Sequence, residues 1–114
     1  MDFEQTIMEL LVHSGSARSS ALMALQRARA GDFVGAQEMM DESRAATREA
    51  HGIQTALIGM DEGCGKLQIN LITVHAQDHL MNAMVIQDLA GDMIELYRRL
   101  PAESVMQVQE ESLA

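Results

Sequence analysis

Two histidines and one carboxylate lie close together in a strongly apolar segment, VHAQDHLM, from Val74 to Met81. On a helix, His75 and His79 lie one turn apart on the same side, with Asp78 at the edge of that side. A neutral imidazole can attack phosphorus and carry a phosphoryl group, provided that nearby donors stabilise the transferring oxygens. The candidate donors are Gln77, His79 and residues of a neighbouring subunit.

Zinc ligation and a structural role are the alternatives for the two histidines. The order His75, Asp78, His79 is superficially similar to the H-x-x-E-H pattern of metalloproteases. The acid here is the shorter aspartate, no clear third ligand follows it, and a thin helical protein of this size offers little room for a substrate cleft. We therefore reject a hydrolytic zinc site. Two ordinary polar residues at a subunit boundary remain the alternative to catalysis.

The composition predicts a single helical domain. The chain has 114 residues, of which 47% are hydrophobic and 3% aromatic, with ten methionines and one proline. This length fits one domain with enough apolar surface for a core. Small and flexible side chains favour helix packed on helix, and few segments show the alternation of β-branched and aromatic residues that is typical of strands.

The net charge is −9, from eight basic and seventeen acidic residues. It argues against nucleic acid as a partner, because nucleic-acid binders carry a basic face. A solvated acidic surface and a basic protein partner are both compatible with it. The single cysteine, Cys64, cannot form an internal disulfide, which is typical of a reducing cytosol. With no signal-peptide pattern and no apolar run long enough to span a bilayer, we expect a cytoplasmic protein without membrane insertion.

Apolar periodicity predicts three long helices. They cover about Phe3–Ala30, the residues after Asp32 to about Gly59, and about Leu67–Leu100, with a glycine-rich loop at Gly59–Lys66. Gly31 is the expected end of the first helix and Asp32 the N-cap of the second, and Pro101 ends the third. Such helices form an antiparallel, all-α three-helix bundle of residues 1–101. The acidic residues 102–114 form a tail that we expect to be disordered.

The third predicted helix is apolar on two sides. Steps of three and four residues, typical of a coiled-coil contact, pass through Leu67, Leu71, Val74, Asp78, Met81 and Val85. A second, largely apolar stripe follows Ile72, Ala76, Leu80, Ala83, Ile86 or Gln87, Ala90 and Ile94. We expect one stripe to be buried within the chain and the other against further subunits.

Burying Asp78 in such a contact costs free energy if its carboxylate is ionised and unpaired. It can be half exposed at a bend, pair with an arginine of another helix, or set the register of the contact. If instead three copies of the helix meet on a threefold axis, their Asp78 carboxylates repel one another. A divalent cation relieves that repulsion, and Mg²⁺ suits carboxylate oxygens and waters.

Longer segments extend the pattern beyond the histidine motif. They are SGSARSSALMAL (Ser14–Leu25), ARAGDFVGAQEMMDES (Ala28–Ser43) and EAHGIQTALI (Glu49–Ile58). With VHAQDHLM, and in this order, they resemble the lactose/cellobiose-type enzyme IIA components of the bacterial phosphoenolpyruvate-dependent sugar phosphotransferase system. Thr47 departs from this resemblance, because an apolar residue is usual there.

The resemblance implies a three-helix bundle that assembles as a homotrimer and acts as a phosphotransferase component. His75 would accept a phosphoryl group from phospho-HPr and pass it to the cysteine of a cognate IIB component, which serves a IIC membrane permease. Asp78 would meet its two symmetry mates at one metal ion per trimer, expected to be Mg²⁺. Gln77 and His79 would support His75. The sugar would be of the cellobiose, chitobiose or lactose type, and a non-catalytic helical scaffold or regulatory trimer is the alternative function.

Overall fold

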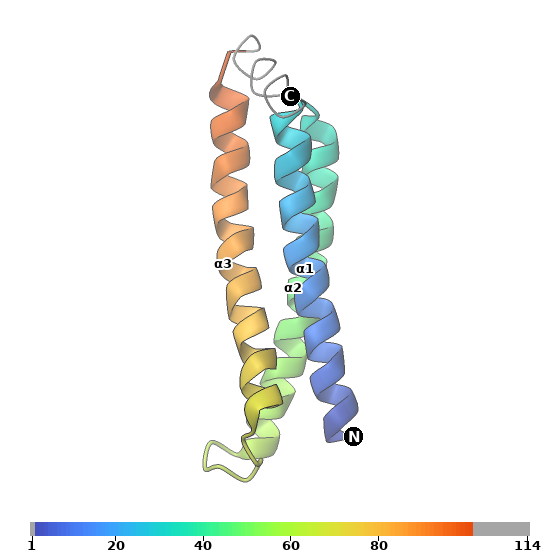
Figure 1. Ribbon diagram of the computed structural model, residues 1–114, viewed down its shortest axis with the longest axis vertical. Coiled ribbons are helices and arrows are strands. Elements are labelled where there is room, and N and C mark those ends of the chain that lie inside the picture. Colours follow the sequence, from blue (N-terminus) through green and yellow to red (C-terminus); the bar gives the residue numbers. More distant parts are fainter. Residues whose placement is uncertain (1, 102–114) are drawn as a thin grey trace.

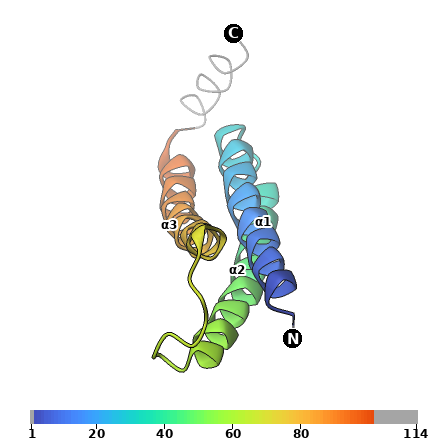
Figure 2. The same ribbon diagram turned by 60° about the horizontal axis from the view of Figure 1, so that its bottom comes forward.

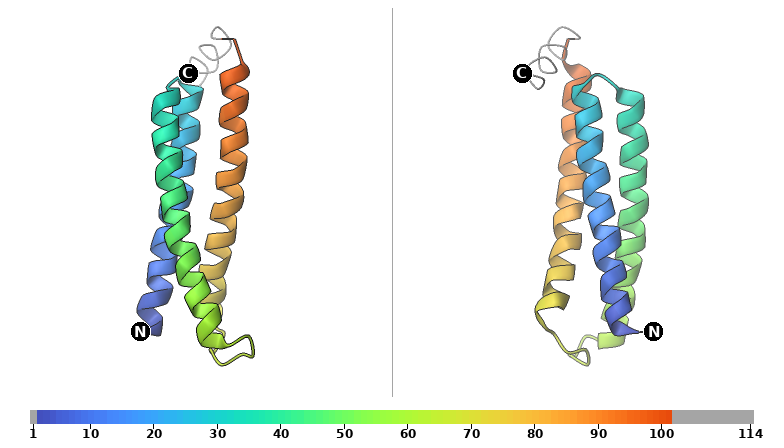
Figure 3. Two further views of the ribbon diagram at one scale, coloured as in Figure 1. Left: turned by 180° about the vertical axis from the view of Figure 1, so that it is seen from behind. Right: turned by 45° about the vertical axis from the view of Figure 1, so that its right-hand side comes forward.

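The protein folds into three long antiparallel helices, as the sequence predicted. The computed structural model describes residues 2–101, and the tail predicted for residues 102–114 lies outside them. The helices are α1 (Phe3–Arg29), α2 (Phe33–Asp61) and α3 (Leu71–Arg99), which alternate in direction along the bundle (Figure 1). In the right-hand view of Figure 3, α1 lies between the other two helices, and it packs along both of them more extensively than they pack on each other.

The turn between α1 and α2 has the caps predicted from Gly31 and Asp32. Gly31 has a positive φ of 84°, a conformation that glycine adopts without steric cost. The Asp32 carboxylate accepts a hydrogen bond from the Gly35 backbone N–H at 2.9 Å and forms an ion pair with Arg27 at 3.3 Å. Gly35 is needed here, because a Cβ at this position would overlap the Asp32 carboxylate. The turn is therefore tied to both helices that it joins.

The third helix begins at Leu71, four residues after Leu67, where apolar periodicity had placed its start. Asn70 and Thr73 form a capping box, because each side chain accepts a hydrogen bond from the backbone N–H of the other, at 3.0 and 2.9 Å. Leu67 stays in the connection, where its backbone N–H donates to the Asp61 carboxylate at 2.9 Å. The predicted start was wrong because hydrophobicity alone does not reveal a polar cap. Because α2 also continues past the predicted Gly59 to Asp61, the loop between α2 and α3 covers residues 62–70, and Figure 2 turns this end of the bundle forward.

Small side chains form much of the core and let the helices approach closely. Two apolar clusters are buried, one in each half of the bundle. The cluster near the α1–α2 turn contains Ala21, Ala24, Ala28, Ala36, Met40, Ala90 and Ile94. The cluster near the α2–α3 loop contains Ile7, Leu10, Ala50, Leu57, Ala76 and Leu80. The α3 members of both clusters belong to the second stripe, so the prediction that one stripe is buried within the chain is confirmed.

A layer of buried and half-buried polar groups lies between the two clusters along the helices. The Gln87 amide of α3 donates to the hydroxyls of Ser43 and Thr47 on α2, both at 2.9 Å. The fully buried Ser43 hydroxyl donates in turn to the Ala17 carbonyl of α1 at 2.7 Å. These bonds satisfy polar groups that are costly to bury alone. They also explain why Thr47 carries a hydroxyl where an apolar side chain was expected.

Replacing Ser43 by alanine is expected to lower the free energy of unfolding by about 1–2 kcal/mol, because it removes a buried hydrogen bond and one of the two acceptors of Gln87. Chemical denaturation of the wild type and the variant at equal protein concentration measures this difference. Ser16 is exposed on α1, and Ser16→Ala is the matched control, with a change expected below about 0.5 kcal/mol. Equal losses in the two variants would contradict a stabilising role for the buried layer.

Candidate functional site

A groove on one side of α3 brings together three of the four residues predicted for the site. It has a volume of about 290 Å³. Its lining residues are Arg18 of α1 and His75, Asp78, His79, Asn82, Val85 and Ile86 of α3. His75, His79 and Asn82 follow one another at steps of four and three residues, which places them on one side of the helix. The groove thus combines an imidazole with further hydrogen-bonding groups and one cation.

His75 is exposed at this groove, next to a partly buried His79. The two imidazole rings lie edge to face, with 4.7 Å between their centroids and 84° between their planes. Such a contact restricts the orientation of the His75 ring while leaving it open to solvent. An accessible, oriented imidazole meets the first requirement of a nucleophile for phosphoryl transfer.

Asp78 lies where this groove meets an exposed apolar stripe of α3. Leu71, Val74, Met81 and Val85 are 85%, 53%, 52% and 55% exposed. In the part of the chain that the structure describes, no ion pair involves Asp78. Across the same residues, no three His, Cys, Asp or Glu side chains come together as possible metal ligands.

Gln77 lies on the other side of α3 from His75, and its side chain is already engaged. Its side-chain carbonyl accepts a hydrogen bond from the Gln54 amide of α2 at 2.5 Å. Within one chain, the structure therefore does not bring Gln77 into the groove of His75. The bond between the two glutamines instead joins α2 to the first part of α3.

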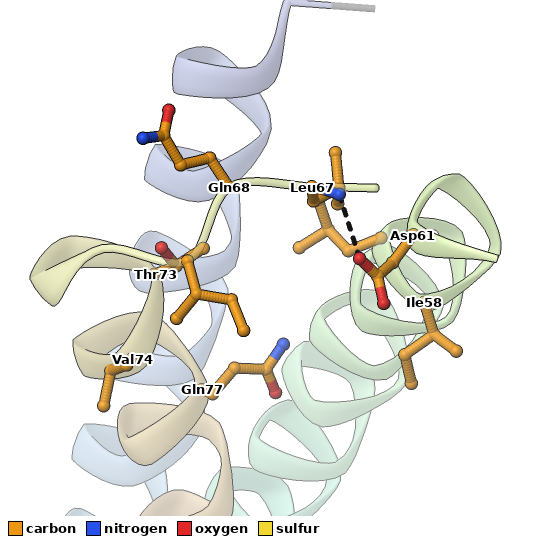
Figure 4. A pocket seen from close by; sticks show the side chains of 9 residues that line it. Ile58, Asp61, Leu67, Gln68, Thr73, Val74 and Gln77 are labelled. Carbon is orange, nitrogen blue, oxygen red and sulfur yellow. Dashed lines mark hydrogen bonds between the residues drawn. The ribbon is translucent and has the colours of Figure 1, made fainter. Parts of the chain in front are cut away.

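An apolar recess of about 320 Å³ lies beside Gln77, between the end of α2 and the start of α3 (Figure 4). Its apolar walls come from Leu57, Ile58, Leu67, Ile69 and Val74. In the close-up the Asp61 carboxylate is turned toward the Leu67 N–H, to which it is hydrogen-bonded. Val74 belongs both to this recess and to the exposed stripe, so apolar surface continues from the loop onto α3.

Comparison with known proteins assigns this architecture to one family. A family model described as "PTS system, Lactose/Cellobiose specific IIA subunit" matches residues 5–98. The chain belongs to the lactose/cellobiose-specific IIA family of the phosphotransferase system. The resemblance seen in the sequence is thereby confirmed, and IIA components are phosphotransfer proteins.

Related IIA components match this IIA chain over most of its length. The N,N'-diacetylchitobiose-specific EIIA component of Escherichia coli K12 is 48% identical over 101 residues, which cover 89% of this chain and 87% of the relative. The lichenan-specific enzyme IIA component of Bacillus subtilis is 40% identical over 99 residues, which cover 87% and 90%.

Solved IIA structures share the fold of this IIA chain. The crystal structure of the cellobiose-specific enzyme IIA from Bacillus anthracis has a TM-score of 0.82 and 42% identity, and the match covers 87% of this chain and 92% of that one. The IIA(chitobiose) of Escherichia coli, solved in complex with HPr, has a TM-score of 0.76 and 46% identity, with 87% and 96% covered. The predicted all-α three-helix fold is confirmed.

Two residues of the IIA groove, Arg18 and Asn82, were not predicted from the sequence. Asn82 could have been found, because it continues the helical spacing of His75 and His79 by three residues. Arg18 belongs to another helix, far away in the sequence, and no local spacing relates it to His75. The arginine enters the site only through the packing of α1 on α3.

Proposed function

We propose that this IIA chain accepts a phosphoryl group from phospho-HPr on His75 and passes it to the cysteine of a cognate IIB component. The observation that carries the proposal is the exposed imidazole of His75, the first histidine of HAQDH, in a groove with polar groups and a cation. The complex of the related IIA(chitobiose) with HPr supports HPr as the donor.

The route would serve the uptake of a disaccharide through a IIC membrane permease. Similarity to chitobiose-, lichenan- and cellobiose-specific relatives supports a sugar of the chitobiose or cellobiose type. None of the helices among residues 2–101 is long and apolar enough to cross a membrane. Phospho-HPr and IIB would dock in turn over His75, and each contact must be weak enough to be released quickly.

The two transfers are substitutions at phosphorus. A ring nitrogen of neutral His75 attacks with its lone pair and forms a nitrogen–phosphorus bond, while the bond between phosphorus and the donor breaks and its electron pair returns to the donor. In the second transfer the IIB thiolate forms a sulfur–phosphorus bond, and the electron pair of the nitrogen–phosphorus bond returns to the imidazole. His79 would keep the ring of His75 oriented through both steps. Positioning and charge stabilisation supply most of the catalysis in such reactions.

We propose further that three chains form a homotrimer around α3. Packing on a threefold axis would bury the exposed apolar stripe, which a monomer would leave in water. The Asp78 carboxylates of the three chains would then approach one another, and oxygen donors of this kind suit Mg²⁺. One Mg²⁺ per trimer would offset their negative charge and so stabilise the assembly.

Intact mass spectrometry tests the proposed function. The wild-type chain is incubated with phosphoenolpyruvate, enzyme I and HPr, and we expect one added phosphoryl group per chain. Omission of HPr is the control and should leave the mass unchanged. Addition of a cognate IIB component should then return the chain to its original mass. A folded wild type that stays unmodified with competent donors would contradict the proposal and favour the non-catalytic scaffold.

A further inference from the structure

The groove of His75 contains a single basic side chain, Arg18 of α1. None of the other seven Lys and Arg residues of the chain lines this groove. The remaining lining residues are neutral, apart from the Asp78 carboxylate and the two imidazoles. A phosphoryl group on His75 would therefore find one fixed positive charge in its surroundings, and it belongs to Arg18.

Among the residues that the structure describes, Arg18 forms no ion pair with a carboxylate, although the chain is strongly acidic. Within the described residues, the four ion pairs use Arg27, Arg44, Lys66 and Arg99. Arg98 lies over the ring of Phe33, with 5.6 Å between its guanidinium carbon and the ring centroid. Asp78 lines the same groove as Arg18, but the two do not form an ion pair. The guanidinium of Arg18 thus keeps its donors available for a ligand.

The backbone at Arg18 is held in place by the core. Ala17, which precedes it on α1, and Ala21, three residues further on, have no exposed surface. The Ala17 carbonyl also accepts the hydrogen bond from the buried Ser43 hydroxyl. An arginine on a fixed backbone loses less freedom when it binds a ligand than one on a mobile loop. The packing of α1 on α3 therefore places the guanidinium of Arg18 in the same groove as the imidazole of His75.

We propose that Arg18 binds the phosphoryl group while it is carried by His75, an assignment that rests on the proposed function. The guanidinium presents planar donors that match phosphate oxygens, and such charge-assisted bonds are among the strongest in proteins. Phosphorylation adds nearly two negative charges to a chain whose net charge is already −9. Arg18 offsets this charge at the groove and stabilises the transferring oxygens in the transition state. The phosphorus–nitrogen bond is made and broken by His75, and Arg18 exchanges no proton in either step.

The test compares Arg18→Gln and Arg18→Lys with Arg29→Gln. Arg29 is exposed on the same helix and lies outside the groove, so its variant controls for the loss of one positive charge. Rapid-quench measurement of phosphoryl transfer from phospho-HPr is expected to show a roughly 100- to 1,000-fold loss of rate in Arg18→Gln. Arg18→Lys should recover part of that loss, because it keeps the charge but not the paired donors. Arg29→Gln should transfer at the wild-type rate.

A second measurement separates phosphoryl binding from partner docking. In ³¹P NMR of the phosphorylated chain, a nearby cation favours the dianionic phosphoryl group and lowers the midpoint of its titration. Loss of the cation in Arg18→Gln should raise that midpoint by roughly one pH unit. Arg29→Gln should leave it unchanged. This readout contains no partner protein and does not respond to a weaker complex.

The outcomes separate this assignment from the function on which it rests. A wild type that HPr does not phosphorylate would contradict the proposed function itself. With a phosphorylated wild type, equal rates and midpoints in Arg18→Gln and Arg29→Gln would overturn the role of Arg18 alone. A slower transfer with an unchanged midpoint would also overturn it, because Arg18 would then act on the partner protein. Matching oligomer mass and helicity of the variants excludes misfolding as the cause.

Discussion

Replacing His75 by alanine is expected to abolish phosphorylation of the chain by HPr. His75 places an exposed imidazole in its groove beside the supporting ring of His79, and alanine leaves no atom that could accept the group. Intact mass after incubation with the complete donor system should show one phosphoryl group on the wild type and none on His75→Ala. Size and helical content of the variant should match the wild type, because an exposed side chain contributes little to the core.

The His79→Ala variant is expected to keep its phosphorylation site but to react more slowly. Its ring supports His75 edge to face at 4.7 Å between centroids, and without it the nucleophile is less well oriented. A loss of roughly 10- to 100-fold in the transfer rate is reasonable for a misplaced nucleophile. His51 is exposed on α2, outside the groove, and His51→Ala should react like the wild type. If His75→Ala were still modified while His79→Ala was not, the acceptor would be His79, and the roles assigned to the two rings would have to be exchanged.

The sequence predicted the regular parts of the fold because their signals are local. The turn at Gly31 and Asp32 depends on neighbouring residues, and the buried stripe of α3 depends on helical periodicity. The other apolar stripe of α3 was predicted for the same reason, and it is exposed in the single chain. The predicted start of α3 was wrong because the side chain of Asn70 caps the helix at Leu71, although apolar residues precede it.

The site was only partly predictable, because its remaining parts depend on how helices pack. Arg18 lines the groove of His75 from another helix, and no spacing in the sequence relates the two residues. Gln77 is only two residues from His75 in the motif, and this separation places it on the opposite side of α3, where Gln54 donates a hydrogen bond to it. The sequence did not explain the hydroxyl of Thr47, because its hydrogen-bond donor, Gln87, belongs to another helix. Each of these three residues is placed by a partner more than 20 residues away in the sequence: His75 for Arg18, Gln54 for Gln77 and Gln87 for Thr47.

Replacing Asp78 by leucine is expected to preserve or strengthen the proposed trimer. The residue sits in the middle of the exposed apolar stripe, with Val74 and Met81 on either side. Leucine would remove the repulsion among three carboxylates and the cost of taking them out of water. It would also add apolar surface to the contact, roughly 1.5–3 kcal/mol for each fully buried side chain. Light scattering and thermal unfolding at several protein concentrations measure the oligomer and its stability.

Val85→Asp is the matched opposite of Asp78→Leu. Val85 lies seven residues further along the same stripe and is 55% exposed in the single chain. A carboxylate there would place three additional charges in the contact without the cation proposed at Asp78, and we expect monomers at micromolar concentration. If the stripe were an ordinary solvated surface, both variants would have the same oligomeric state as the wild type.

A chelator distinguishes the metal ion from the contact itself. If Mg²⁺ offsets the Asp78 carboxylates, its removal should lower the unfolding temperature of the wild-type trimer and leave Asp78→Leu unaffected. If the chelator changed the unfolding temperature of neither protein, the proposed cation would be contradicted, but the proposed trimer would not. An Asp78→Leu variant that was monomeric under ordinary salt would contradict a larger part of the proposal. It would mean that the carboxylate makes a net favourable contact in the assembly, contrary to the repulsion and desolvation cost expected for it.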